Sequence, residues 1–252
     1  MATFSFSEGD LQLHVAKVGL DIFPPIELRS ERTRLNMFYE EAVRRWPNLF
    51  DGIHATDTEF KIVREFREHP DRHGPKVSLD TFVLTQRGPV FVFPLLLPEP
   101  VGDTGLGTGY LKQFREICEL FLRAVPEKKI MRVGLVRELV FGTGATSCVN
   151  LLTSECSFAG ADLMGGKSLV AYRDLRCNIR LEVEPIQVMK ATQMPIGTRV
   201  EEPAGYGLRV RLDVNNCEIR PLDDADIDMV LDRATSLWPD ALLKYLNERR
   251  VS

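Results

Sequence analysis

The segment Gly165-Gly166-Lys167-Ser168 ends with the three residues that close a phosphate-binding loop. Such a loop cradles phosphate with backbone N–H groups and a lysine, and it requires another glycine five residues before Gly166. Ala161 occupies that position, and Gly160 lies one place too early. The residues after Ser168 are typical of a strand, whereas the motif needs a helix there. We therefore interpret the segment as a tight glycine turn.

Metal binding and nucleophilic catalysis need polar side chains that converge. His69 and His73 lie with two carboxylates in one short segment, but Pro70 opposes the helix that would bring both imidazoles onto one face. The five cysteines include no C-x-x-C pair, and Cys148 and Cys156 have no histidine nearby in the sequence. The sequence predicts no metal, cofactor or catalytic residue, and it leaves open an enzyme whose site is assembled from distant residues.

A group of arginines offers a different chemistry, the binding of anionic groups. Apolar and polar residues alternate strictly from Leu175 to Glu184 and again from Leu208 to Val214, which is typical of strands with one wet face. If the two strands pair, their arginines share that face, beside a tyrosine on which a nucleic-acid base can stack. The candidate binding residues are Arg176, Arg180, Arg209, Arg211 and Tyr172.

Carboxylates on the same strands weaken the hypothesis of a nucleic-acid interface. Glu182, Glu184 and Asp213 fall on the arginine side and offset much of its positive field. The formal net charge of −4 also opposes bulk electrostatic capture of nucleic acid or an anionic membrane. A mixed-charge face of this kind is solvated, or it docks on a protein with matching acidic and basic groups.

Amphipathic helices and further strands would position these residues. Apolar spacing of three and four residues predicts three main helices, at 35–46, 110–125 and 227–238, with Ser30 as N-cap of the first and Asp223 or Asp224 opening the last. Further strands are predicted at 11–18, 60–66 and 130–141, and a hairpin turns through Gln86-Arg87-Gly88. The apolar run Pro89–Pro98 is interpreted as an interior strand, or else as a strand that meets a partner.

The predicted fold class is α+β, with antiparallel sheets packed by three main amphipathic helices. The pattern Ala42-x-x-x-Trp46-Pro47 recurs as Ala234-x-x-x-Trp238-Pro239, which allows two related lobes, although chance explains the recurrence nearly as well. We place the boundary at Gly142, between an N-terminal α+β lobe, residues 1–142, and a C-terminal α+β lobe, residues 143–252.

Several short segments carry a resemblance in their order along the chain. They are Phe23-Pro24-Pro25-Ile26, the helix before Pro47, the strand-rich middle, Phe114–Val125 leading into Ile130–Leu135, and Leu231-Asp232-Arg233-Ala234. This order resembles a sporadically distributed family of uncharacterised bacterial proteins of similar length, with no assigned activity. The resemblance implies a prokaryotic cytosolic protein in a mobile-element or defence setting, and it supplies no catalytic residue.

Composition and the first residues of the chain indicate the class of protein and its expected location. Hydrophobic residues make up 44% and charged residues 27% of the 252 residues, which is typical of a globular protein. The first residues lack the basic region and apolar run of a signal peptide, so we expect a cytoplasmic location and no membrane partner. The leading hypothesis is a non-enzymatic interaction module, a subunit, adaptor or regulator that binds another protein or its own copy. The alternatives are nucleic-acid binding through the arginine face and an enzyme whose site the sequence does not reveal.

Overall fold

The structure, a computed structural model, describes residues 5–67, 76–97, 109–144, 167–174, 176–193 and 199–248. These residues form an α+β fold with one nine-stranded antiparallel sheet, four α-helices and a short 3-10 helix. The strands are β1 (Leu11–Phe23), β2 (Gly52–Ala55), β3 (Phe60–Arg67), β4 (Lys76–Thr85), β5 (Gly88–Leu96), β6 (Lys129–Gly144), β7 (Ser168–Arg173), β8 (Cys177–Gln193) and β9 (Arg199–Asn216). The helices are η1 (Glu8–Asp10), α1 (Arg32–Arg45), α2 (Tyr110–Ala124), α3 (Asp224–Ser236) and α4 (Asp240–Glu248).

The strand order is β2-β3-β4-β5-β1-β6-β9-β8-β7, with β1 and β6 paired at the centre. The strands on the two sides of this central pair are arranged in a similar way. β1 pairs on its other side with β5, the last strand before α2, and β6 pairs with β9, the last strand before α3. One sheet therefore contains strands from both sides of residue 142, and the two related lobes stay a prediction.

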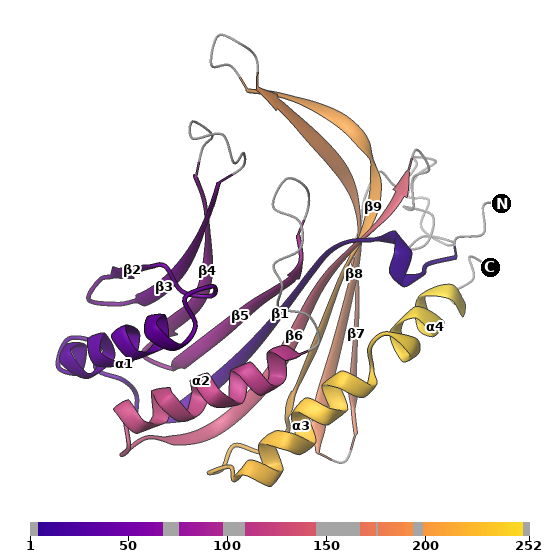
Figure 1. The fold of residues 1–252 in the computed structure, drawn as a ribbon. Helices are drawn as coiled ribbons and strands as arrows, with labels where there is room; N and C mark the ends of the chain where they lie inside the picture. Colours follow the sequence, from indigo (N-terminus) through magenta and orange to yellow (C-terminus); the bar gives the residue numbers. More distant parts are fainter. Residues whose placement is uncertain are drawn as a thin grey trace, which may run out of the picture.

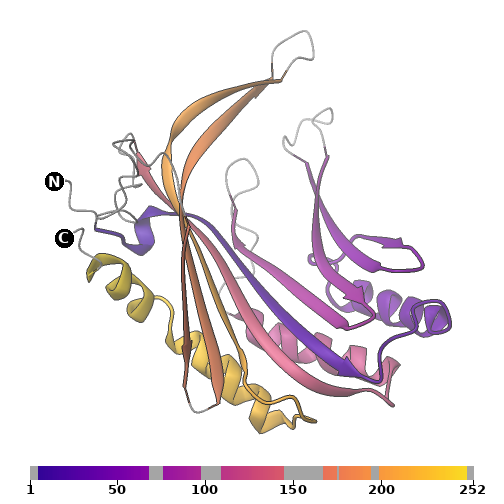
Figure 2. The same ribbon diagram turned by 180° about the vertical axis from the view of Figure 1, so that it is seen from behind.

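The sheet is strongly bent. Figure 1 shows the helices along its convex side, and Figure 2 shows from behind the concave side, which no described helix covers. Because successive side chains of a strand point to opposite faces, β1 buries Ala16 and Val18 against the helices and leaves Val15 and Lys17 half-exposed on the concave side. The concave side is thus a broad sheet surface open to solvent in the described part of the chain.

The core lies between the sheet and the helices. Phe82 of β4 is fully buried, and its ring contacts the rings of four other phenylalanines, Phe38, Phe60, Phe91 and Phe121. On the other half of the sheet, Val210 and Val214 of β9 and Val230 of α3 are fully buried in the same core. This packing holds the sheet against all four helices and sets which side chains remain on the concave side.

Several predicted elements are confirmed. The alternating segments form β8 and β9 and pair with one another, and the hairpin through Gln86-Arg87 joins β4 to β5. β5 lies inside the sheet between β4 and β1, as the interpretation of Pro89–Pro98 as an interior strand requires. α3 begins at Asp224, and the Asp223 carboxylate accepts a hydrogen bond from the Asp226 N–H at 2.8 Å.

Two helix predictions differ from the structure. Ser30 does not cap α1, because its hydroxyl donates to the Glu27 carbonyl oxygen in the preceding turn, and the residue at the N-cap is Glu31. A fourth helix, α4, follows Pro239 and adds to the three main helices that were predicted. None of the described helices has the length and apolar run needed to cross a membrane.

Candidate functional site

Three of the predicted arginines share the concave side of the sheet. Arg209 and Arg211 lie on β9, and Arg180 lies on the neighbouring β8. In the β8–β9 register, each arginine lies opposite a carboxylate, in the pairs Arg180–Asp213, Glu182–Arg211 and Glu184–Arg209. The pairing brings these arginines together as predicted, and it places the acidic residues among them.

Arg176 and Tyr172 do not join this group. Tyr172 pairs across β7 and β8 with the buried Ile179, so it lies on the convex side, where it lines a groove with Tyr245 of α4. Arg176 precedes β8 and lines a groove beside α3 with Met229. The prediction that Tyr172 offers a stacking ring beside the arginine face is therefore wrong, because the β7–β8 register turns it to the opposite face.

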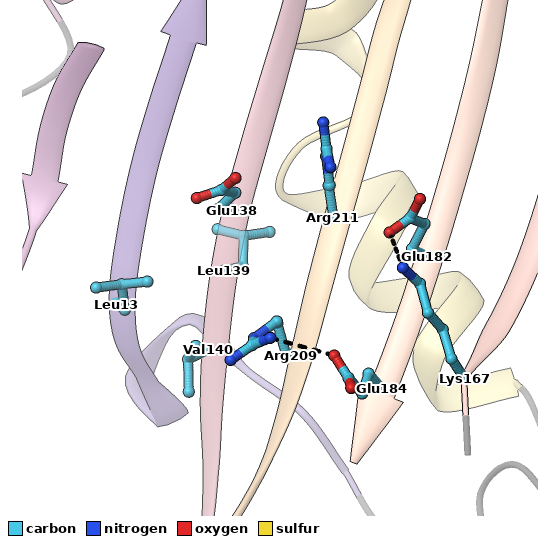
Figure 3. A pocket seen from close by; sticks show the side chains of 9 residues that line it. All are labelled: Leu13, Glu138, Leu139, Val140, Lys167, Glu182, Glu184, Arg209 and Arg211. Carbon is cyan, nitrogen blue, oxygen red and sulfur yellow. Dashed lines mark hydrogen bonds and ion pairs between the residues drawn. The ribbon is translucent and has the colours of Figure 1, made fainter. Parts of the chain in front are cut away.

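Most charges around the middle of the concave side are joined in ion pairs, either between neighbouring strands or within one strand. Lys17 of β1 lies 2.8 Å from Glu138 of β6. On the other side of β9, Glu182 accepts from both Lys167 at 2.5 Å and Arg180 at 3.0 Å. The hydrogen bond from Lys167 is the main cause that lowers the pKa of Glu182. A further pair joins Arg209 to Glu184 at 3.2 Å, and Figure 3 marks it together with the Lys167–Glu182 pair.

Arg211 lies in the middle of these ion pairs but takes part in none. It stands between Glu138 of β6 and Glu182 of β8 in the strand register. No carboxylate of the described residues lies within 4.0 Å of its guanidinium, because its neighbours are engaged by Lys17, Lys167 and Arg180. Figure 3 shows its side chain without a marked interaction. Arg211 is thus an exposed cation that is available to a ligand.

A cavity of about 360 Å³ on the concave side is lined in part by Arg211. Its lining residues are drawn in Figure 3 and are Leu13, Glu138, Leu139, Val140, Lys167, Glu182, Glu184, Arg209 and Arg211. Next to it, toward β5, the same face carries half-exposed apolar side chains, Val15, Val90, Val92 and Val136. The concave side therefore combines an apolar area with a charged cavity.

The pairing of strands β1 and β6 brings together two site residues that the sequence analysis did not identify. Lys17 and Glu138 are more than one hundred residues apart in sequence and meet only because β1 and β6 form the central strand pair. Both strands alternate apolar and polar residues, which assigns each side chain to a face. Alternation contains no information about which strands are neighbours, so no signal in the sequence would have found this pair.

Two buried cysteines, Cys118 and Cys177, show no sign of activation for nucleophilic chemistry. Burial raises the pKa of the Cys118 thiol to about 12 and that of Cys177 to about 11, so both are protonated and weakly reactive at neutral pH. Among the described residues, no three His, Cys, Asp or Glu side chains are grouped to hold a metal ion. His69, His73, Cys148, Cys156 and the glycines at 165 and 166 lie outside the described residues.

Comparisons with known proteins add no functional information. No protein-family model matches the chain, and no match was found among curated proteins or solved structures. The part of the concave side around Arg211 is thus the candidate site on physical grounds alone.

Proposed function

We propose that the chain is a non-enzymatic protein-interaction module that docks a partner protein on the concave side of its sheet. The observation that carries this proposal is Arg211, an exposed cation with no described carboxylate within 4.0 Å, in a cavity whose other described charges are already paired. An arginine in this position binds a carboxylate through two parallel hydrogen bonds, which adds geometric specificity to charge. From the family resemblance, we further propose a role as subunit, adaptor or regulator in a bacterial cytosolic complex, in a defence or mobile-element setting.

The partner that fits this face has an acidic side chain next to apolar ones. The acidic group would meet Arg211, and the apolar groups would cover the half-exposed valines, such as Val136 and Val140. Interfaces draw most of their binding energy from a few central residues, with arginine prominent among them, while a surrounding ring of contacts excludes water. The ion pairs of Lys17, Lys167 and Arg209 would form that ring.

The charge balance of the concave side favours a protein over a nucleic acid. Around the cavity, the described cations of this face are Lys17, Lys167, Arg180, Arg209 and Arg211, and the described carboxylates are Glu138, Glu182, Glu184 and Asp213. Binding to a phosphate backbone depends on a clear excess of positive charge. A nearly balanced face instead matches a protein surface that carries both signs. Nucleic-acid binding through Arg180, Arg209 and Arg211 remains the alternative to be tested.

Photo-crosslinking in the native host tests the proposal directly. A photoreactive amino acid replaces Val140 in the cavity, and in a control chain it replaces Met37, which is 66% exposed on α1. We expect a protein adduct from position 140 and none of the same mass from position 37. Adding Arg211→Glu should remove the adduct, whereas Arg29→Glu, at an exposed turn residue, should leave it unchanged.

The crosslinked partner, once purified, allows a measurement of affinity. Losing a desolvated charge pair costs at least about 2 kcal/mol, so we expect Arg211→Glu to raise Kd at least about 30-fold. An adduct that nuclease digestion removes would support the nucleic-acid alternative instead. A monomeric protein that gives no adduct at position 140 would overturn both.

A further inference from the structure

Arg137 is a cation buried in the core on the convex side of the sheet. It lies on β6 opposite Ala16 of β1, and only 2% of its surface is exposed. Arginine keeps its charge in proteins, and taking an ion out of water is unfavourable unless an opposite charge compensates it. A lone buried arginine therefore calls for a partner of negative charge.

The groups that contact Arg137 are neutral. Its Nη1 lies 3.0 Å from His14 Nε2, and its Nη2 donates to the Tyr110 hydroxyl oxygen at 2.8 Å. Because the guanidinium only donates, Nε2 of His14 must accept, which requires the neutral imidazole. Burial and then the charge of Arg137 lower the pKa of His14 to about 4, so the ring is uncharged at neutral pH. Burial raises the pKa of Tyr110, which keeps its hydroxyl protonated.

The donors of Arg137 are only partly used. A guanidinium has five N–H groups, and the described residues accept from two of them. The Nε atom is buried and has no hydrogen-bond partner in the part of the chain that the structure describes. No carboxylate of the described residues lies within ion-pair distance of Arg137, although Glu and Asp side chains pair with most other buried or half-buried cations here. Its Nε–H is thus a buried donor without an acceptor.

Two hydrogen bonds to neutral groups, and the Tyr110 ring 5.6 Å from the guanidinium carbon, compensate the charge of Arg137 only in part. An apolar side chain of similar length would fill the same place on β6 without the desolvation penalty, since such replacements of buried ions are often neutral or stabilising. Unpaired buried charges with two further polar groups beside them are instead found at ligand-binding and catalytic sites. Arg137, His14 and Tyr110 come from three separate elements, β6, β1 and α2, and converge on one point.

We propose that Arg137, with His14 and Tyr110, is the anion-binding centre of a site for a small organic acid with one carboxylate. One buried cation balances one negative charge, so a monocarboxylate leaves the site neutral, whereas a dianion such as phosphate would leave a charge uncompensated. The planar carboxylate matches the fork of the guanidinium and supplies the acceptor that Nε–H lacks.

The rings around the cluster indicate the remainder of the ligand. Trp238, at the junction of α3 and α4, packs edge-on against His14 with ring centroids 5.4 Å apart. Phe93 of β5 lies against Tyr110 at 5.6 Å. These side chains offer contacts to apolar and aromatic groups and few to polar ones. The ligand class is therefore an acid with an apolar or aromatic body, bound on the face of the sheet opposite to the proposed docking surface.

Thermal unfolding of the full chain tests the site with defined probes. Phenylacetate and hexanoate carry the proposed charge, and phenylacetamide and hexanamide are the matched neutral controls. We expect the acids to raise Tm in a concentration-dependent way and the amides to leave it unchanged. Arg137→Met should abolish the rise, and its own Tm without ligand should stay close to that of the wild type, because removal of the buried charge offsets the loss of the hydrogen bonds to His14 and Tyr110. Inorganic phosphate is the third arm and should produce no shift.

The fluorescence and NMR signals of the two tryptophans keep the test decisive if Arg137→Met fails to fold. In the wild type, the acids should shift the indole resonance of Trp238. The indole resonance of Trp46, which packs against Phe50 at the end of α1, should not change. Equal effects of acids and amides, or no effect of either acid on Tm and Trp238, would overturn the proposal. A shift with phosphate alone would overturn the assignment of a monocarboxylate.

Discussion

His14 Nε2 lies 3.0 Å from Nη1 of Arg137, across the central pair of strands β1 and β6. His14 is 8% exposed, and its place beside a buried cation opposes the uptake of a proton. The neutral imidazole is therefore part of the folded state, and it links the stability of the protein to pH.

Stability should fall in mild acid because of His14. Its pKa drops from 6.5 to about 4 on folding, so the unfolded chain takes up a proton at a higher pH than the folded protein. The stabilisation by the neutral ring is complete above pH 6.5 and is lost as the pH falls to 4. The loss should approach about 3 kcal/mol, at 1.36 kcal/mol for each unit of pKa. Urea unfolding between pH 4 and 7 measures it.

His14→Gln provides the matched variant for this experiment. The glutamine side chain accepts a hydrogen bond from Arg137 but does not titrate, so the pH dependence in this window should largely disappear. His54→Gln, at an exposed position, should retain the wild-type dependence. A wild-type profile that is flat over this range would show that His14 is solvated in solution.

The strand alternation explains how much of the fold could be predicted from sequence. Residues from Cys177 to Val183 and from Leu208 to Val214 alternate so strictly that the face of each side chain follows from the pattern, and β8 and β9 confirm these faces; their pairing, which the sequence analysis only considered, is also observed. The same reasoning failed for Tyr172. Its face depends on the register across the short connection before Cys177, and a shift of one residue reverses every side chain of a strand.

Arg211 on β9 and Arg137 on β6 show which structural information a local sequence pattern does not contain. Arg211 was found because it lies in a strongly alternating strand, but its lack of an ion pair depends on Lys17 and Lys167 engaging the carboxylates nearby. Arg137 lies in a segment that the sequence correctly predicts to be a strand. Its side chain lies on the buried face of that strand. Which charges become neighbours is set by strand order, which depends on long-range packing rather than on local pattern.

The aromatic core around Phe82 should be the most sensitive to truncation. Phe82 is fully buried and contacts four phenylalanine rings from α1, α2, β3 and β5. Phe82→Ala removes these contacts and leaves a cavity, so we expect it to lower the free energy of unfolding by about 3–5 kcal/mol. Met37→Ala, at a side chain that is 66% exposed, should change it by less than about 0.5 kcal/mol. Denaturant titration followed by circular dichroism measures both; similar values for the two variants would contradict the packing described here.

Gly88, at the start of β5, should tolerate no side chain. Its φ is +145°, and an added Cβ would lie 2.1 Å from the backbone carbonyl oxygen of Leu20. Because both the backbone conformation and a rigid neighbour oppose it, Gly88→Ala should lower the free energy of unfolding by more than about 1 kcal/mol. At Gly9, the nearest atom to an added Cβ is 3.5 Å away, and Gly9→Ala should be close to neutral. Equal unfolding midpoints in urea would contradict the prediction.

A second loss of stability is expected at lower pH, from Asp226 in the first turn of α3. Its two carboxylate oxygens each accept a hydrogen bond from Arg220 at 2.7 Å, and it also accepts from the Asp223 N–H. The hydrogen bonds from Arg220 are the main cause that lowers the pKa of Asp226 to about 2.

Because this pKa is depressed, the stabilisation by the Asp226 carboxylate is complete above its ordinary value of 3.8 and is lost as the pH falls to about 2. This window lies below that of His14, so the two contributions separate in one titration. Asp226→Asn should be less stable than the wild type at pH 7 and should lose less stability between pH 4 and 2. Asp57→Asn, in an exposed bend, should follow the wild-type curve. If the Asp226→Asn and wild-type curves ran parallel through this window, the carboxylate would not be bound to Arg220 in solution.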